Sequence, residues 1–277
     1  MKIKFLGTGA AEGIPSMFCE CTVCKTARIT GGKNIRTRSQ AIVNDDLLID
    51  FCADMLIHTI MQKVDMTRVK NCIVTHAHPD HLYPNNIIMR MPPFSYIKNI
   101  EPFNIYGSEA VVLAVESITK AEGMKEDAAK LHVVKPFEPF VILNYTITAL
   151  PARHSVSTGP FIYLIQQVGK NLLYAHDTGY LLDEVFEYLK NNKIRLDFVS
   201  LDCTLAFSEE DYYGHMNVLQ GLKVKDMLYV NGSADAKTLF CFNHFSHNGE
   251  DVLYDEFAKQ VQAYGFSTSY DEMEVVF

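Results

Sequence analysis

The sequence predicts a single α+β domain in which helices lie outside two β-sheets. The chain has 277 residues and is 48% hydrophobic, which is enough apolar surface to bury a sizeable core. Strand and helix patterns are mixed along the chain instead of alternating strictly, and this order favours two sheets over one parallel sheet. No Ser/Gly linker, low-complexity tract, long charge run or repeat divides the sequence, so we expect residues 1–277 to form one domain.

Short runs of apolar or alternating residues predict the strands, because such runs fit a pleated surface that is buried on one or both faces. In chain order these runs are Ile3–Leu6, Ala41–Val43, Leu47–Asp50, Cys72–Val74, Phe103–Tyr106, His132–Val134, Tyr145–Leu150, Phe161–Ile165, Asn171–Tyr174, Phe198–Leu201 and Thr238–Phe242. Longer runs with apolar residues at helical spacing predict helices. They are Ala53–Val64, Ser108–Glu122, Leu182–Asn191, His215–Leu228 and Asp251–Tyr264.

The charge balance and the N-terminal residues limit the partners and the compartment. Lys and Arg total 25 against 33 Asp and Glu, and the formal net charge of −8 disfavours a broad grip on a long nucleic acid. A small anionic substrate held mainly by metals fits this balance better. The segment Met1–Gly7 has no long apolar region, and no run in the chain reaches the length of a membrane span. We therefore expect a cytoplasmic protein without a membrane partner; whether it forms a homodimer stays open.

The most informative motif is the segment His76–His81, which follows the apolar run Cys72–Val74 and holds three His and one Asp. A strand that ends in a ligand-bearing loop is predicted. His76 and His78 lie two apart and can point the same way, whereas Asp80 and His81 follow a proline that turns the chain, so the loop can serve two metals. A solvated polar turn is the alternative, which such tight spacing disfavours.

Three further polar residues follow the ends of predicted strands. They are His154, Asp177 and His244. Taken alone, each is more often a surface or hydrogen-bonded residue than a metal ligand. Together they predict ligands delivered to one rim, because rigid strands fix the backbone position from which each side chain starts.

A second cluster consists of Cys19, Cys21 and Cys24 on a loop between early strands. Structural zinc is commonly held by four Cys or by three Cys and one His, so this cluster asks for a fourth ligand. His247, three residues after His244, is the best candidate, since Cys72, Cys203 and Cys241 lie within apolar runs and are expected in the core. A redox or disulfide cluster is the alternative, which a cytosolic compartment disfavours.

These motifs resemble the metallo-β-lactamase superfamily, whose fold is a four-layered αβ/βα sandwich with two mixed sheets, outer helices and two metals at the edge of the sheets. The resemblance covers nearly the whole chain. It implies that a hydroxide bridging the two metals attacks the substrate. The implied ligands are His76, His78 and His154 for one metal, Asp80, His81 and His244 for the second, and Asp177 as the bridge between them.

Landmarks outside the ligands carry the same resemblance. The glycine-bearing start Phe5–Gly9 and the segment Leu48–Asp50 look like family features, which implies that Asp50 orients a metal-binding His from behind. Cys52 stands where the family often has glycine, and we expect its thiol to be inert packing.

The Cys-x-Cys-x-x-Cys pattern is similar to the PhnP branch of the superfamily, phosphodiesterases that open cyclic phosphates. In that branch a His three positions after the last catalytic ligand similarly binds structural zinc, as His247 would here. The branch further implies that His215, in Gly214–Asn217 at the predicted start of a helix, approaches the scissile phosphate and stabilises charge or protonates the leaving oxygen. Asn217 would support it. An ordinary helix-capping or surface role is the alternative for His215.

Other segments leave their role open. Arg36 and Arg38 either lend charge to the pocket or lie on an exposed strand, and Tyr83–Pro102 forms either a lid or plain core. His58, His132 and His176 fit no predicted site.

The expected activity is two-metal hydrolysis of small phosphodiesters, cyclic ones included, with Asp80 and His215 at the reacting centre. Zinc or manganese is the expected metal pair, with iron also open, beside one structural zinc. The alternatives are a lactonase, a thioesterase, a tRNA 3′-end endonuclease, a PqqB-like biosynthesis protein with a similar thiol cluster, and a non-catalytic protein that metals stabilise for interaction.

Overall fold

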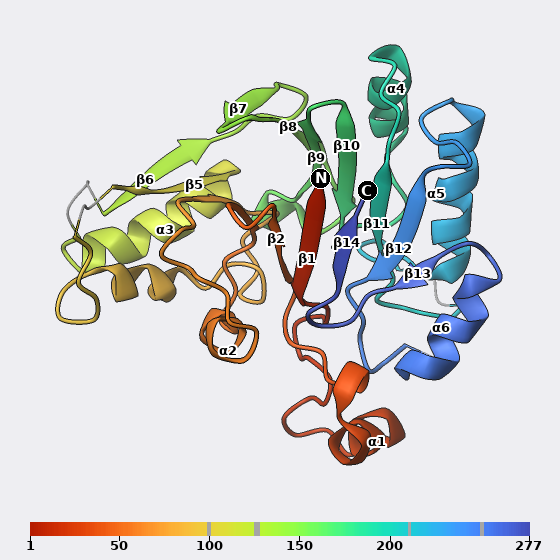
Figure 1. Ribbon diagram of the computed structural model, residues 1–277, viewed down its shortest axis with the longest axis horizontal. Helices are drawn as coiled ribbons and strands as arrows, with labels where there is room; N and C mark the ends of the chain where they lie inside the picture. The colour runs from red at the N-terminus through yellow and green to blue at the C-terminus, as the bar shows by residue number, and fades with distance from the viewer. Residues whose placement is uncertain (99–100, 125–127, 210–211, 250–251) are drawn as a thin grey trace.

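Two seven-stranded sheets form the centre of the computed structural model, which describes residues 1–98, 101–124, 128–209, 212–249 and 252–277 (Figure 1). The first sheet runs in the order β14 (Glu274–Val276), β1 (Lys2–Gly7), β2 (Gln40–Val43), β3 (Leu47–Ile49), β4 (Asn71–Ile73), β5 (Phe103–Gly107) and β6 (Ala129–Val133). The second runs in the order β13 (Ser267–Thr268), β12 (Leu239–Asn243), β11 (Phe198–Asp202), β10 (Lys170–Ala175), β9 (Phe161–Gln167), β8 (Tyr145–Pro151) and β7 (Phe140–Ile142). The predicted α+β class with two mixed sheets is confirmed.

The two sheets share one pattern of pairing. In the first sheet the pairs from β14 to β3 are antiparallel and the pairs from β3 to β6 are parallel. In the second sheet the pairs from β7 to β10 are antiparallel and those from β10 to β13 are parallel. Parallel strands need long connections, and those connections carry helices as well as the loops of His76–His81, Asp177 and His244.

Helices cover the outer face of each sheet. They are α2 (Met55–Met61), α3 (Glu109–Ala121), α4 (Asp183–Asn191), α5 (Val218–Val230) and α6 (Tyr254–Gln262). A further helix, α1 (Thr22–Thr30), lies outside these layers, and short 3₁₀ turns are η1 (Gly32–Asn34), η2 (Pro84–Arg90) and η3 (Val156–Thr158). In Figure 1, α2 and α3 lie beside the first sheet, and α4, α5 and α6 lie beside the second. This arrangement gives the four layers.

The hydrophobic core consists of separate clusters, each between two neighbouring layers of the four-layered fold. Ile3 and Phe5 of β1 pack in the cluster between the sheets, whereas Leu6 packs in the cluster under α2 and α3. On β9, Tyr163 lies in the inter-sheet cluster and Leu164 in the cluster under α4, α5 and α6. Successive side chains of a strand point to opposite faces, so each central strand supplies two cores.

Several elements differ from the sequence predictions. The short edge strands β7, β13 and β14 were not predicted, because two or three residues carry no periodic signal and pair only when a neighbour is present. The helix predicted at Ala53–Val64 is shorter, and that predicted at Asp251–Tyr264 begins at Tyr254, with Asp251 outside the described residues. Among the described residues, no helix is long and apolar enough to cross a membrane.

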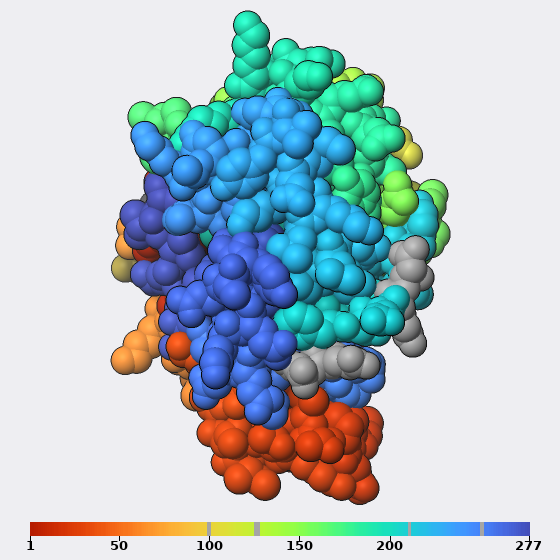
Figure 2. Space-filling model, turned by 90° about the vertical axis from the view of Figure 1, so that its right-hand side faces the viewer, coloured from red at the N-terminus to blue at the C-terminus, as the bar shows by residue number. Residues whose placement is uncertain are grey.

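The segment between β1 and β2 leaves the sheets and carries α1, a helix that the sequence analysis missed. Cys21 caps α1, since its side chain accepts a bond from the backbone N–H of Cys24. Figure 2 shows this N-terminal segment as a lobe at one end of the molecule, beneath residues near the C-terminus. We call residues 10–35 the cysteine lobe.

Candidate metal centre

The predicted ligands come from loops that follow four strands at the same edge of the two sheets. The segment His76–His81 follows β4, His154 follows β8, Asp177 follows β10 and His244 follows β12. Asp177 and His244 have positive φ angles of 49° and 62°, which residues with a side chain rarely adopt. Backbone strain therefore accumulates where these ligands leave their strands.

Three imidazoles form the first cluster. His78 Nδ1 lies 2.9 Å from His76 Nε2 and 3.1 Å from His154 Nε2. His76 and His154 are buried, and the three ligand atoms lie within 4.8 Å of one another. The cluster is therefore a candidate site for one metal ion.

Asp80, His81, Asp177 and His244 form the second cluster, and all four are buried. Asp177 Oδ2 lies 2.5 Å from His81 Nε2 and 2.8 Å from His244 Nε2, while its Oδ1 lies 3.6 Å from His154 Nε2 in the first cluster. Asp80 Oδ2 is 3.3 Å from His81 Nε2. One carboxylate therefore presents an oxygen to each cluster, which is the arrangement expected of a bridging ligand.

The hydrogen bonds behind the second cluster fix which nitrogen of each imidazole faces inward. His81 Nδ1 donates to Asp50 Oδ2 at 2.7 Å. Thr204 Oγ1 donates to the carbonyl of His244, so it accepts from His244 Nδ1 at 2.8 Å. In a neutral imidazole the other nitrogen, Nε2, then carries a lone pair.

The first cluster is prepared in the same way. His154 Nδ1 donates to the carbonyl of Gly214 at 3.0 Å. Thr75 Oγ1 donates to Asp50 Oδ1 at 2.8 Å, so it accepts from His76 Nδ1 at 3.1 Å. A Cβ added at Gly214 would lie 2.8 Å from His154 Nδ1, which explains the glycine beside this ligand.

The inward-facing atoms fit a cation and little else. His81 Nε2 and His244 Nε2 lie 3.2 Å apart, and buried Asp177 Oδ2 lies within 2.8 Å of both nitrogens. Three acceptors this close repel one another unless positive charge lies among them. Nitrogen ligands together with carboxylates are the donor set of zinc and of related divalent metals.

The pKa values express the same demand for positive charge. Burial works to lower the pKa of His81, but the carboxylates of Asp177, Asp50 and Asp80 outweigh it and raise that pKa well above its usual value. Burial likewise opposes ionisation of Asp177, but His244 and His81 hold its pKa well below the usual range. Protons compensate the carboxylates when metals do not.

A third group, which the sequence analysis missed apart from His215, lies beside the second cluster. Asp202 is buried at the end of β11, and its oxygens accept bonds from the backbone N–H groups of Asp177, Thr204 and Met216. His215 Nδ1 lies 3.1 Å from both Asp202 Oδ2 and Thr204 Oγ1. The only sequence signal for Asp202 was an acid at the end of an apolar strand.

The structure changes the surroundings predicted for His215. Helix α5 begins at Val218, so His215 lies in the preceding loop and not at the start of a helix. Asn217 is the N-cap of α5, with Oδ1 accepting from Gln220 N–H and Nδ2 donating to Ser208 O. Asn217 therefore fixes the end of the His215 loop instead of supporting the metals.

The two predicted arginines also lie elsewhere than in the rim. Arg36 is buried, where it donates to Thr8 Oγ1 and to the carbonyl of Ser269. Arg38 pairs with Asp54 at 2.9 Å. Both residues therefore have structural partners, which disfavours the first of the two predicted alternatives, that they lend charge to the pocket.

The Tyr83–Pro102 segment is largely surface. It carries η2, which packs on α3, and Phe94 and Tyr96 are exposed, while residues 99–100 lie outside the described part.

His132, His176 and Cys52 have structural surroundings. His132 stacks on Tyr106, His176 is buried against Tyr174, and the thiol of Cys52 is buried behind Arg38 O.

In the cysteine lobe, the structure brings His247 to the three thiols. His247 Nδ1 lies 3.6 Å from both Cys19 Sγ and Cys21 Sγ, and the four ligand atoms, Cys24 Sγ included, lie within 4.8 Å of one another. Tetrahedral zinc with Zn–S of about 2.3 Å and Zn–N of about 2.1 Å separates S from N by roughly 3.6 Å. In the structure, the cysteines of the described residues are free thiols.

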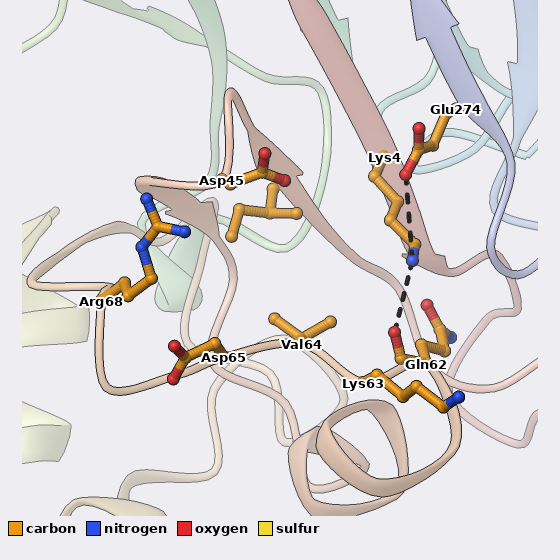
Figure 3. A pocket seen from close by; sticks show the side chains of 9 residues that line it. Lys4, Asp45, Gln62, Lys63, Val64, Asp65, Arg68 and Glu274 are labelled. Carbon is orange, nitrogen blue, oxygen red and sulfur yellow. Dashed lines mark hydrogen bonds and ion pairs between the residues drawn. The ribbon is translucent and has the colours of Figure 1, made fainter.

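A surface hollow of about 180 Å³ lies at the opposite end of β4 from the ligands (Figure 3). Its lining includes Gln62–Asp65 and Arg68, which precede β4, whereas the ligands follow that strand. Lys4 crosses it to meet Gln62 O at 3.5 Å and Glu274 at 4.0 Å. The hollow is therefore separate from the metal centre.

Comparison with known proteins agrees with this geometry. A model of the beta-lactamase superfamily domain matches residues 46–239. The chain belongs to the metallo-β-lactamase superfamily. Ribonuclease Z of Picosynechococcus sp. is 24% identical over 268 residues, which span 92% of this chain and 77% of that protein. The superfamily fold implies divalent metals, and the His and Asp clusters described above supply ligands for them.

Two solved structures share the fold over the whole chain. A diphosphatase from the PhnP family aligns with a TM-score of 0.75 and 20% identity, covering 100% of this chain and 98% of that one. Zinc-bound PqqB from Methylobacterium extorquens aligns with a TM-score of 0.76 and 16% identity, covering 100% of both chains. These likenesses show the fold, and the proteins concerned do not select one substrate.

Proposed function

We propose that this protein is a phosphodiesterase that hydrolyses small, including cyclic, phosphodiesters at a site for two divalent metals. The observation that carries the proposal is the placement of His215 beside the candidate bridging ligand. His215 Nδ1 lies 3.1 Å from Asp202 Oδ2 and 3.7 Å from Asp177 Oδ1, and the contacts described for the ring leave Nε2 available. An imidazole held from behind by a buried carboxylate is suited to donate a proton in front.

The charge state of His215 supports the role of an acid. Burial alone would lower its pKa, but Asp202, Asp177 and Asp80 raise the pKa to about 9. Metals bound to Asp177 and Asp80 would offset those two carboxylates, and Asp202 is the carboxylate that would still favour the imidazolium form. That form can protonate the leaving oxygen of a phosphodiester or stabilise charge on the phosphoryl oxygens. A lactone or thioester presents fewer oxygens for such a cation.

His76, His78 and His154 would hold one metal, Asp80, His81 and His244 the other, and Asp177 both. When bound, the two metals supply positive charge for phosphate oxygens and lower the pKa of water. The protein fixes the tautomers of the ligand histidines through hydrogen bonds to their other ring nitrogens. Asp50, Thr75, Thr204 and the carbonyl of Gly214 keep the ligand nitrogens unprotonated and aimed at the metals.

A tRNA 3′-end endonuclease is the second candidate, because a curated relative is named ribonuclease Z. The net charge of −8 weighs against a broad grip on tRNA. A metal-loaded preparation assayed on 2′,3′-cyclic nucleotides, a nitrophenyl diester, a phosphomonoester, a lactone, a thioester and a precursor tRNA separates the candidates. Turnover of small diesters alone supports the proposal. Cleavage of the tRNA with no turnover of small diesters supports the endonuclease, and inactivity on every substrate supports a non-catalytic role.

A further inference from the structure

A series of hydrogen-bonded polar side chains leads from the turn before β14 to the floor of the metal centre, half-buried at Thr37 and Asp271 and buried at His58 and Gln40. It passes from Asp271 through Thr37, His58 and Gln40 to the backbone of Asp50. His58 lies on α2 and had no predicted role. Because Asp50 orients His81 and accepts from Thr75, the far end of this series reaches the residue behind both metal clusters.

At the Asp50 end of this series, the direction of each hydrogen bond is fixed. Gln40 Nε2 donates to the carbonyl of Asp50 at 2.9 Å, and a carbonyl can only accept. Gln40 Oε1 therefore faces His58 Nδ1, at 2.7 Å, and accepts from it. His58 Nδ1 must carry a proton, so in a neutral ring Nε2 has none.

The other end of this series is short of one proton. Thr37 Oγ1 lies 2.8 Å from His58 Nε2 and 2.6 Å from Asp271 Oδ2. A hydroxyl has one hydrogen, so it cannot donate to a neutral imidazole and to an ionised carboxylate at once. Both short contacts are hydrogen bonds only if a further proton lies on Asp271 or on His58 Nε2.

Burial disfavours the charged form of the titratable group at each end of this hydrogen-bonded series. Burial raises the pKa of Asp271 to about 6 and lowers the pKa of His58 to about 4, so each charge is disfavoured alone. The charged groups facing the series are Asp54, which favours protonated His58, and Arg36, which favours ionised Asp271. Moving the proton between the ends changes no net charge, so the two groups titrate as a pair.

Asp50 needs a brace of this kind. Its φ is 68°, in the left-handed region that a residue with a side chain avoids. Asp50 N–H donates to Ile73 O at 2.9 Å, and the carbonyl accepts from Gln40, so bonds on both sides hold the strained peptide. Loss of one bond would let Asp50 relax and turn its carboxylate away from His81.

We propose that His58 is a positioning residue of the metal centre, which shares one proton with Asp271 through Thr37 and holds Asp50 in place through Gln40. The inference rests on the two-metal centre proposed above and not on the identity of the substrate. Its tests therefore use no substrate, and their outcome is independent of the phosphodiesterase assay.

The brace is tested by three substitutions of His58 that keep different contacts. Asn places an amide near the position of Nδ1 and can still donate to Gln40, Gln reaches toward Thr37 instead, and Leu makes neither bond. The cysteine lobe keeps its zinc while Co²⁺ is titrated into the centre and its visible absorption is recorded.

We expect His58→Gln and His58→Leu to weaken Co²⁺ binding by about 10- to 100-fold and to shift the absorption bands, with His58→Asn close to the parent. Circular dichroism checks that each variant is folded, and if His58→Leu does not fold, the Asn and Gln variants decide. Parental affinity and bands in His58→Gln, or an Asn variant as impaired as the Gln variant, would overturn the proposal.

The shared proton is tested in the zinc-loaded protein by ¹⁵N NMR of its histidines. We expect His58 Nδ1 to stay protonated, and the hydrogen-bonded resonance of Nε2 to shift in one step with the carboxyl of Asp271 near pH 6, where the pair loses its shared proton. Thr37→Val should remove the hydrogen-bond shift of Nε2, and Thr37→Ser, which keeps the hydroxyl, should retain it. A His58 ring that titrates alone in the parent, or equal spectra for the Val and Ser variants, would contradict the shared proton.

Discussion

The metal centre and the cysteine lobe gather similar ligands by opposite means. The centre takes its ligands from four strand ends, and all of them except His78 are buried. The lobe takes three of its four ligands from Cys19–Cys24, and of the residues in α1 only Cys24 and Ala27 are buried. Sheets therefore position the ligands of the centre, whereas the lobe has little apolar core of its own to hold its shape.

This difference predicts separate consequences of metal loss. A ligand set built on rigid strands persists when its metals are removed, because the sheets stay packed. A small lobe whose ligands lie on a loop and one short helix depends on its metal for structure, since binding free energy is then folding free energy. Four substitutions test this difference between the two regions, from the one with the largest expected effect to the one with the smallest.

Cys21→Ser should have the largest effect, because zinc binding by such a site contributes on the order of 10 kcal/mol. We expect loss of one zinc from about three metals per chain, a marked fall in the melting temperature and exposure of the lobe to protease. Elemental analysis and thermal unfolding measure it. Cys52→Ser, which changes a buried thiol outside both clusters, is the control and should cost about 1 kcal/mol. A Cys21→Ser protein with parental melting and three metals would refute the structural zinc.

Asp80→Ala should abolish turnover while the protein stays folded. The substitution removes a ligand of the second cluster, so we expect kcat to fall on the order of 10⁴-fold or more and metal content to drop, with little change in circular dichroism. Glu116→Ala, on the exposed face of α3, serves as the control. If Asp80→Ala unfolds as readily as Cys21→Ser, the proposed contrast between the two regions is wrong.

His215→Ala should keep both metals and the fold but lose about 10²- to 10⁴-fold in kcat on a diester with a poor leaving group. A smaller loss on an activated nitrophenyl diester indicates that His215 protonates the leaving oxygen, and equal losses indicate that it stabilises phosphoryl charge. His132→Ala, on the first sheet away from the centre, is the control. Unchanged kcat on every diester would return His215 to a structural role.

Thr204→Val should have the smallest effect of the four. Thr204 Oγ1 accepts from His244 Nδ1 and lies 3.1 Å from His215 Nδ1, so its loss frees two imidazoles to rotate. We expect metal affinity to fall by about 10- to 100-fold, as metal titration would measure. Thr204→Ser keeps the hydroxyl and should behave like the parent; if it is as impaired as Thr204→Val, the methyl group and not the hydrogen bond matters.

Local sequence patterns predicted the ligands of both regions, but they predicted the helices next to those ligands less well. The spacing of the cysteines predicted the three thiol ligands of the lobe. Helix α1 was not predicted, because it buries few apolar residues and Cys21 is an unusual N-cap. The strand ends led to the centre, because an apolar run followed by His or Asp is visible in a single sequence. The prediction that a helix begins at His215 was wrong, because Asn217 and Gln220 form a capping box and α5 begins at Val218.

By itself, the sequence determined the α+β class, the sheet-forming runs and the residue types available to bind metals. Those depend on local periodicity and on side-chain chemistry. Only the tertiary structure decided that Asp177 presents one oxygen to each cluster, that Asp202 and Thr204 hold His215, and that Arg36 is buried with hydrogen bonds to Thr8 and Ser269. These contacts join residues far apart in the chain, and the pairing of the strands that brings them together leaves no local signal in the sequence.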